Sequence, residues 1–174
     1  MEWSLYPHPA RPAASMTALT CSIERDAAAL NLVYRVEGAH GALHLPDSAA
    51  PLRTDGLWAT TCLELFVADA GGAYREFNFS PSGQWAAYSF TAPRAGMAPL
   101  ALHAPPAIRL GEEGGATILS VHLPGVGAGA LRLGITAVIE ELDGTKSYWA
   151  LQHGADAPDF HDPDCFVAQL PPAD

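Results

Sequence analysis

Basic residues are scarce in this sequence. Nine Lys and Arg stand against nineteen Asp and Glu among 174 residues, which gives a formal net charge of −10. Nucleic-acid binding depends on clustered Lys and Arg that neutralise phosphates, and anionic membrane surfaces attract basic segments for the same reason. The charge therefore argues against nucleic acid and membrane lipids as partners.

Cysteines and long apolar runs are also scarce. The three cysteines, an odd number, show no C-x-x-C spacing, which favours reduced thiols in a cytoplasm; they are Cys21, Cys62 and Cys165. No stretch approaches the roughly 18 apolar residues of a membrane-spanning helix. Residues 1–9 carry neither the basic nor the apolar region of a secretory signal. We therefore expect a cytoplasmic protein, and the sequence leaves its oligomeric state open.

Glycine and proline are frequent and divide the chain into short pieces. Sixteen glycines and fifteen prolines leave no room for long helices, while 49% hydrophobic and 16% charged residues are typical of a globular chain. About ten short strands joined by tight turns predict an all-β fold, an antiparallel, jelly-roll-like β-sandwich forming one domain over residues 1–174. The expected strands are Leu19–Glu24, Ala29–Glu37, Thr61–Ala68, Tyr74–Phe79, Gln84–Thr91, Ala107–Leu110, Thr117–Leu123, Leu131–Glu141, Ser147–Leu151 and Phe166–Leu170.

Turn-forming residues lie between these strands. Arg25–Ala27, Asp69–Gly72 and Ser80–Gly83 each join two strand-like segments, and links containing Gly, Asp, Ser or Pro are typical of hairpins. Residues 92–106, rich in Ala and Pro, are expected to form a loop.

Alternation assigns the faces of the strands, because successive side chains in a strand point to opposite sides. Leu63, Leu65 and Val67 form an aliphatic row that should pack in the core with Phe77 and Phe79 of the next strand. A further inward row is expected from Leu131, Leu133, Ile135, Ala137 and Ile139.

The opposite face carries the residues of functional interest. Glu64, Glu76 and Asn78 share it if the two strands pair as a hairpin. Carboxylates and amides hydrogen-bond sugar hydroxyls, while an aromatic ring covers the apolar face of a sugar. The alternative is a solvated outer face whose aromatic neighbours lie in the core. The candidate aromatic platforms are Trp58, Trp85 and Trp149.

Three blocks of sequence resemble a known family. They are Arg53–Trp58 with Thr61–Phe66, then Tyr74–Tyr88, and finally Val138–Glu140, Ser147–Leu151, His153 and Pro158–His161. Together they resemble the bacterial DOMON-like domain proteins, relatives of the family-nine carbohydrate-binding modules, over nearly the whole chain. The resemblance implies a β-sandwich whose superfamily binds sugars or haem.

The resemblance also suggests roles for individual residues. In the sugar-binding relatives, tryptophans sandwich a sugar while charged and amide side chains hold its hydroxyls. Those relatives are usually secreted modules, whereas this sequence shows no leader, which favours a small sugar or another metabolite. The candidate ligand-binding residues are Trp58, Glu64, Glu76, Asn78, Glu140, Trp149 and His153.

Haem and metal ions are alternative ligands. Haem would need an axial His or Met in an apolar pocket, but there is no C-x-x-C-H attachment motif. The acidic segment 156–164, with His153 before it, has donors for a divalent cation, or forms a proline-punctuated turn in which Asp159 or Asp162 bonds local backbone. We expect no bound metal or cofactor. The candidate axial ligands for haem are His122, His153, His161 and Met97.

Catalytic and interaction roles are further alternatives. Glu64 and Glu76 could form a glycosidase pair, but no other catalytic constellation accompanies them. Residues 125–130 fit a G-x-G-x-x-A pattern but precede a strand instead of the helix that a dinucleotide site needs. Exposed aromatics could also form a protein-interaction patch. The sequence favours a non-catalytic module that binds a small ligand, with carbohydrate as the preferred class.

Overall fold

The computed structural model describes residues 1–26, 28–154 and 156–173, which form antiparallel β-strands and three short 3-10 helices. The 3-10 helices are η1 (Leu57–Ala59), η2 (Ala70–Gly72) and η3 (Pro163–Cys165). The strands are β1 (Glu2–Pro7), β2 (Met16–Arg25), β3 (Ala29–Gly38), β4 (Cys62–Ala68), β5 (Tyr74–Phe79), β6 (Trp85–Phe90), β7 (Ala98–Pro99), β8 (Ala107–Glu113), β9 (Ala116–Pro124), β10 (Leu131–Glu140), β11 (Lys146–Ala150) and β12 (Ala168–Leu170).

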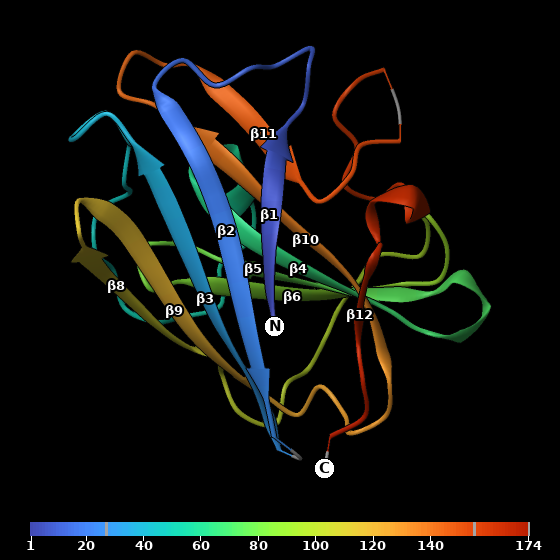
Figure 1. The fold of residues 1–174 in the computed structure, drawn as a ribbon. Helices are drawn as coiled ribbons and strands as arrows, with labels where there is room; N and C mark the ends of the chain where they lie inside the picture. The colour runs from blue at the N-terminus through green and yellow to red at the C-terminus, as the bar shows by residue number, and fades with distance from the viewer. Residues whose placement is uncertain (27, 155, 174) are drawn as a thin grey trace.

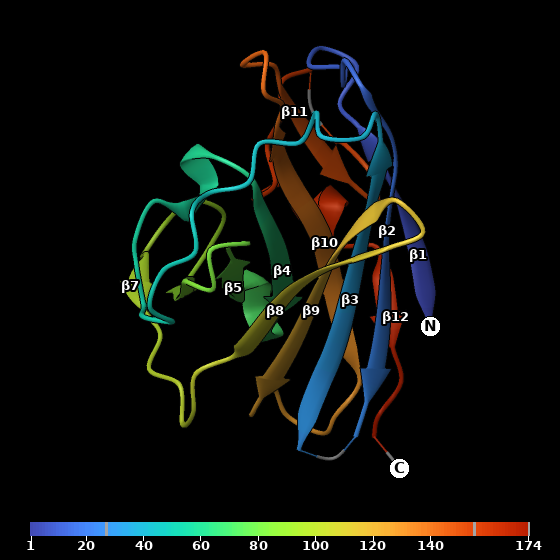
Figure 2. The same ribbon diagram turned by 90° about the vertical axis from the view of Figure 1, so that its left-hand side faces the viewer.

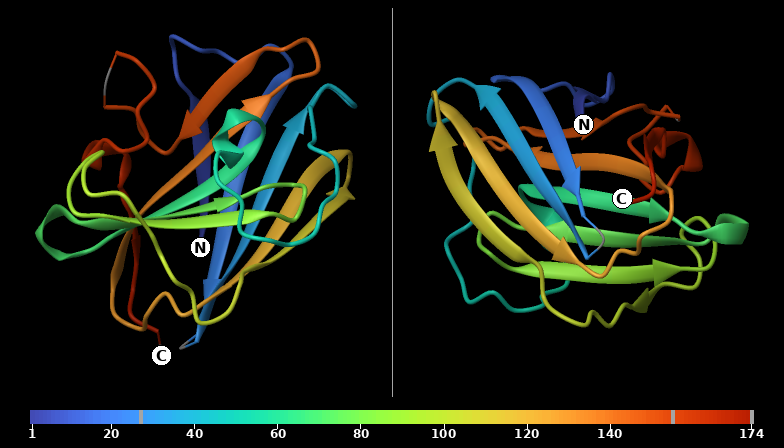
Figure 3. Two further views of the ribbon diagram at one scale, coloured as in Figure 1. Left: turned by 180° about the vertical axis from the view of Figure 1, so that it is seen from behind. Right: turned by 60° about the horizontal axis from the view of Figure 1, so that its bottom comes forward.

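The strands form one curled sheet that folds over to make two layers. Its order is β7-β6-β5-β4-β10-β11-β1-β2-β3-β9-β8, with β12 beside β10. Strand β1 pairs with β2 and with β11, and thereby joins the two layers. In Figure 1 the layer of β2, β3 and β9 lies in front of β4, β5 and β6, and Figure 3 shows the layers crossing. This confirms the predicted all-β, sandwich-like antiparallel fold.

The main core lies between the two layers. Leu63, Leu65, Val67, Phe77 and Phe79 are all buried there, as alternation predicted. Burying each such side chain contributes about 1.5–3 kcal/mol, so a slip of one residue in register would be costly. The other layer supplies Leu19, Ile23, Leu32, Tyr34, Leu119 and Leu123.

The expected turns connect paired strands. In the β5–β6 link, the N–H of Ser80 donates to the carbonyl of Gln84 over 2.9 Å, and Gly83 adopts a φ of 93° that glycine allows. The β4–β5 hairpin has Glu64 opposite Asn78, and Glu76 opposite Phe66. Ala27, part of the turn expected between β2 and β3, lies outside the described residues.

The structure adds elements that the sequence pattern did not indicate. Strand β1 ends at Pro7, which lacks an N–H for the sheet but is tolerated at a strand end. The short β7 lies inside the loop expected at residues 92–106, and β8 continues to Glu113 (Figure 2). The last strand begins at Ala168 instead of Phe166, because Phe166 caps the end of η3 and its N–H donates to the carbonyl of Pro163.

A second hydrophobic cluster covers the outer face of the layer that contains β4, β5, β6, β10 and β11. The expectation of an open polar face is therefore corrected: most of this face is buried beneath η1, η3 and the chain around Phe160. The cluster consists of Leu57, Cys62, Phe66, Tyr74, Ala86, Tyr88, Phe90, Val138, Ala150, Phe160, Cys165 and Phe166.

No helix in the described ranges is long and apolar enough to cross a membrane.

Candidate functional site: an acidic pocket with aromatic walls

A cavity of about 370 Å³ opens on this outer face. Strands β4, β5, β10 and β11 form its floor, and η1, the β6–β7 connection and the segment around residue 160 form its walls. The volume lies at the lower end of the range of small-molecule pockets, about 300–1,000 Å³. The lining residues are Trp58, Glu64, Phe66, Glu76, Phe90, Arg94, Met97, Val138, Tyr148, Pro158, Phe160 and His161.

Two glutamates give the floor its acidic character. Glu64 on β4 and Glu76 on β5 are diagonal neighbours in the ladder, and their side chains are only 3% and 5% exposed. The hydroxyl of Thr136 donates to Glu64 Oε2 over 3.0 Å, and Asn78 Nδ2 donates to Glu76 Oε1 over 2.8 Å. These neighbouring donors orient the two carboxyl groups.

The environment of the glutamates disfavours two full negative charges. Burial, reinforced by the neighbouring Glu76, raises the pKa of Glu64 to about 8. Burial also raises the pKa of Glu76, although the hydrogen bond from Asn78 opposes this shift. Two interacting carboxyls titrate as a pair, so the floor retains a proton at neutral pH.

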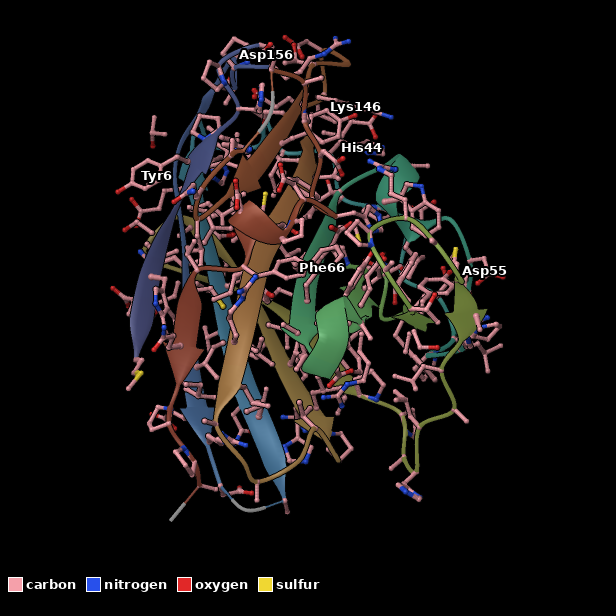
Figure 4. All side chains as sticks on the ribbon, turned by 90° about the vertical axis from the view of Figure 1, so that its right-hand side faces the viewer. Tyr6, His44, Asp55, Phe66, Lys146 and Asp156 are labelled. Carbon is pink, nitrogen blue, oxygen red and sulfur yellow. The ribbon has the colours of Figure 1, made fainter. Side chains whose placement is uncertain are left out.

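Aromatic side chains form the walls above this floor. Phe66 follows Glu64 by two residues on the same face of β4, and its ring stacks on Phe166 with 5.4 Å between centroids. Trp58 lies at the mouth, 42% exposed, with its ring edge towards Tyr88. Figure 4 shows Phe66 near the middle of this face. The remaining aromatic lining comes from Phe90, Tyr148 and Phe160.

A polar network closes the rim. The guanidinium of Arg94 donates to both carboxylate oxygens of Asp159, at 3.2 Å and 2.8 Å. His161 Nδ1 lies 2.8 Å from the hydroxyl of Tyr74, and His161 Nε2 lies 3.9 Å from Glu76 Oε2. These contacts fix the two loops over the sheet.

The rim also has a defined charge state. Burial lowers the pKa of His161, and the charge of Arg94 lowers it further, so the imidazole is neutral at pH 7. Burial alone would raise the pKa of Asp159, but hydrogen bonds from Arg94 and from the N–H of His161 lower it overall. The positive charge of Arg94 is therefore matched by Asp159 and not by the floor.

The structure brings four of the seven predicted site residues together. Trp58, Glu64 and Glu76 line the cavity. Asn78 is completely buried behind Glu76, where it positions the carboxyl through its amide.

The other three predicted residues lie outside the cavity. Trp149 is in the main core, 2% exposed, and its indole N–H donates to Ser147 Oγ. Its side chain points inward because Trp149 lies opposite Ala137, a core residue, so Tyr148 faces the pocket instead. Trp85 likewise packs against the main core.

Glu140 and His153 both lie outside the cavity lining. Glu140 lies 3.6 Å from His44 and 3.8 Å from Lys146, at the end of the sheet shown at the top of Figure 4. His153 Nε2 lies 2.9 Å from the carbonyl of Tyr6 and outside the cavity lining. Neither residue belongs to the acidic pocket.

Several lining residues were not among the predicted set. Phe66 could have been found, since it shares the face of Glu64 by alternation. Arg94, Phe160 and His161 come from loops whose distance from the floor along the sequence hides their proximity.

The acidic segment 156–164 forms local structure. Asp162 Oδ1 accepts from the N–H of Asp164 at the start of η3, and Asp159 pairs with Arg94. Within the part of the chain that the structure describes, no three His, Cys, Asp or Glu side chains gather as a metal site would require. The contacts of Asp159 and Asp162 match the acidic-turn interpretation.

Comparisons with known proteins add a structural likeness. No protein-family model and no curated protein match the chain significantly. Among solved structures, the chain is similar to a candidate carbohydrate-binding protein from Bacteroides uniformis, with a TM-score of 0.70 and 15% identity. The match covers 96% of this chain and 84% of the other. At this identity, the likeness establishes a common fold.

Proposed function

We propose that this protein is a non-catalytic module that binds a small carbohydrate in the acidic pocket. The observation that carries the proposal is the combination of two buried carboxyl groups on the floor with aromatic rings on the walls. The fold shared with a candidate carbohydrate-binding protein supports it.

The chemistry of the pocket suits a sugar. The carboxyl oxygens of Glu64 and Glu76 accept hydrogen bonds from hydroxyls, and a retained proton on the pair lets one carboxyl donate as well. Phe66, Phe160 and Tyr148 offer flat apolar surfaces for the C–H faces of the ring. Trp58 at the mouth adds a further platform for the bound sugar.

Haem, which the resemblance also implied, does not fit this site. His161 and Met97 both line the cavity, but both ring nitrogens of His161 face other groups, Tyr74 and Glu76. The acidic floor would also repel the carboxylates of haem, and haem sites are predominantly apolar. We therefore do not assign haem to the pocket.

Isothermal titration calorimetry with a panel of monosaccharides and disaccharides tests the proposal. We expect binding that weakens at least tenfold in Glu76→Gln, because the amide replaces an acceptor oxygen with a donor group. Glu140→Gln removes the same charge outside the pocket and should bind as the parent protein does. Absence of binding across the panel by the folded protein would contradict the proposed function.

A further inference from the structure

The floor of the acidic pocket lacks positive charge. Arg94 is the one Arg or Lys side chain of the lining, and its guanidinium is held bidentately by Asp159. His161, 3.9 Å from Glu76, is neutral at pH 7. The charge of Arg94 lowers the pKa of Glu76, but among the described residues no cationic side chain donates a hydrogen bond to either glutamate.

The floor also offers a ligand more hydrogen-bond acceptors than donors. Glu64 accepts from Thr136, and Glu76 accepts from Asn78. Asn78 Oδ1, completely buried and directly opposite Glu64 in the ladder, has no hydrogen-bond partner within the described part of the chain. A buried acceptor without a donor is costly. Asn78 does not line the cavity, so a ligand that donates hydrogen bonds would meet the carboxyl oxygens of Glu64 and Glu76 instead of this amide.

The walls suit a cation as well as a sugar ring. The faces of aromatic rings are electron-rich and attract ammonium groups, an effect of about 0.5–2 kcal/mol per favourable contact. The lining aromatics Trp58, Phe66, Phe90, Tyr148 and Phe160 lie around the same cavity as the two carboxyls. Their position and the acidity of the floor therefore favour the same kind of ligand.

We propose that the pocket selects an amino sugar, whose protonated primary amine lies between Glu64 and Glu76 while the walls hold the sugar ring. An ammonium carries one positive charge and three N–H donors, which complement the acceptor oxygens of the two carboxyl groups. This inference rests on the proposed function, because it assigns the ligand class of the same pocket.

Binding should be linked to protonation. An ammonium stabilises the ionised form of both carboxyls, so the pair should release a proton when the ligand binds. The other titratable and charged groups near the pair are the phenols of Tyr34, Tyr74, Tyr88 and Tyr148, the thiol of Cys62, and the rim residues Arg94, Asp159 and His161. Burial raises the pKa values of Tyr34, Tyr74, Tyr88 and Cys62, so these groups keep their protons near pH 7, whereas hydrogen bonds from Arg94 and His161 lower the pKa of Asp159, which is ionised there.

Matched ligands isolate the contribution of the amine. Glucosamine, galactosamine and mannosamine are titrated by calorimetry at pH 7 beside their N-acetyl derivatives and the parent hexoses. We expect the best hexosamine to bind at least tenfold more tightly than its neutral counterparts. Repeating the titration in buffers with different ionisation enthalpies should show a proton released to solvent.

Variants connect the preference to the floor. In Glu64→Gln and Glu76→Gln, each checked for folding by circular dichroism, the advantage of the hexosamine over the parent hexose should fall at least tenfold. Glu140→Gln, with the same change in net charge, should keep that advantage. Two floor variants are used so that misfolding of one leaves the other as the test.

The outcomes separate this inference from the proposed function. Equal binding of hexosamines and neutral hexoses would overturn the amine preference and leave carbohydrate binding intact. Equal binding of 1,4-diaminobutane and a hexosamine would support a cation site and contradict the carbohydrate class. If no ligand of either kind binds, both proposals fail.

Discussion

Asn78 donates a 2.8 Å hydrogen bond to Glu76 and lies directly opposite Glu64 in the β4–β5 ladder. One buried amide thus adjoins both acidic side chains of the pocket. An amide carries no charge, so it orients a carboxyl without neutralising it. This arrangement keeps the two glutamates in place without supplying a charge that would neutralise them.

Replacing Asn78 with Ala should raise the pKa of Glu76 further, because the hydrogen bond from Asn78 now opposes the effect of burial. NMR titration of ¹³C-labelled glutamate carboxyls would measure the change. Asn31→Ala, in the other layer beside His122, is the control and should leave Glu76 unaffected. An unchanged Glu76 titration in Asn78→Ala would show that this bond does not influence the pair.

The stability of the protein should depend on the ionisation of Glu64. Its pKa is about 8 when folded, against an ordinary value of 4.5, so the unfolded chain releases its proton first as pH rises. The free energy of unfolding should therefore fall between these pH values. Glu64→Gln stays neutral, and at pH 7.5 it should exceed the parent protein in stability by roughly 1–3 kcal/mol.

Urea denaturation at pH 4 and pH 7.5 provides the measurement for Glu64→Gln. At pH 4 both proteins are largely neutral at this position, and their stabilities should nearly coincide. A difference that stays constant across this range would mean that Glu64 ionises normally in the folded protein.

Removing Arg94 should shift the titration of His161. Burial and the charge of Arg94 both lower the pKa of His161, so Arg94→Ala should raise it and also leave Asp159 without its bidentate partner. NMR titration of the imidazole protons follows this change. Arg109→Ala, on the distant strand β8, should have no effect, and an unmoved His161 in Arg94→Ala would contradict the rim network.

Gly134 is a packing-sensitive position beneath the pocket. A Cβ at Gly134 would clash with Cδ1 of Phe166, whereas a Cβ at Gly129 would meet nothing within 4 Å. Gly134→Ala should therefore lower stability by about 1–3 kcal/mol through overpacking of the second hydrophobic cluster. Thermal unfolding would show a lower midpoint for Gly134→Ala, and equal midpoints for the two variants would refute the close approach.

The tryptophan at the mouth should report binding. Trp58 is the exposed indole of the lining, while Trp149 is in the core and out of contact with solvent. A sugar that stacks at the mouth should change intrinsic fluorescence, and Trp58→Phe should abolish the change. Trp3→Phe, in the strand that joins the layers, should retain it. A response that persists without Trp58 would place the ligand elsewhere.

Local periodicity predicted the floor of the pocket but not its walls. The period of two along β4 and β5 placed Glu64, Glu76 and Asn78 on one face, and the structure has them there. Trp149 lies outside the pocket because the register of β11 against β10 turns its side chain towards the core and that of Tyr148 towards the pocket. The sequence alone does not reveal that register. Register depends on contacts between distant segments.

The loops were harder still to predict. Arg94 and Asp159 are 65 residues apart in sequence and meet through a bidentate ion pair. Neither segment has a regular hydrophobic period that would assign it to a face. The expected aromatic platforms were tryptophans, whereas most of the aromatic rings of the lining belong to Phe and Tyr.

The acidic floor belongs to paired strands and the walls belong largely to connecting loops. Insertions and substitutions in loops are tolerated far more readily than changes in a sheet whose every side chain is packed. Exposed positions of the β6–β7 connection, such as Met97, can therefore be varied while the carboxyl pair stays fixed on the sheet and Phe160 stays packed in the second cluster. For the proposed class of ligand, the sheet would supply a constant anchor for one functional group and the exposed loop positions a replaceable frame for the rest of the molecule.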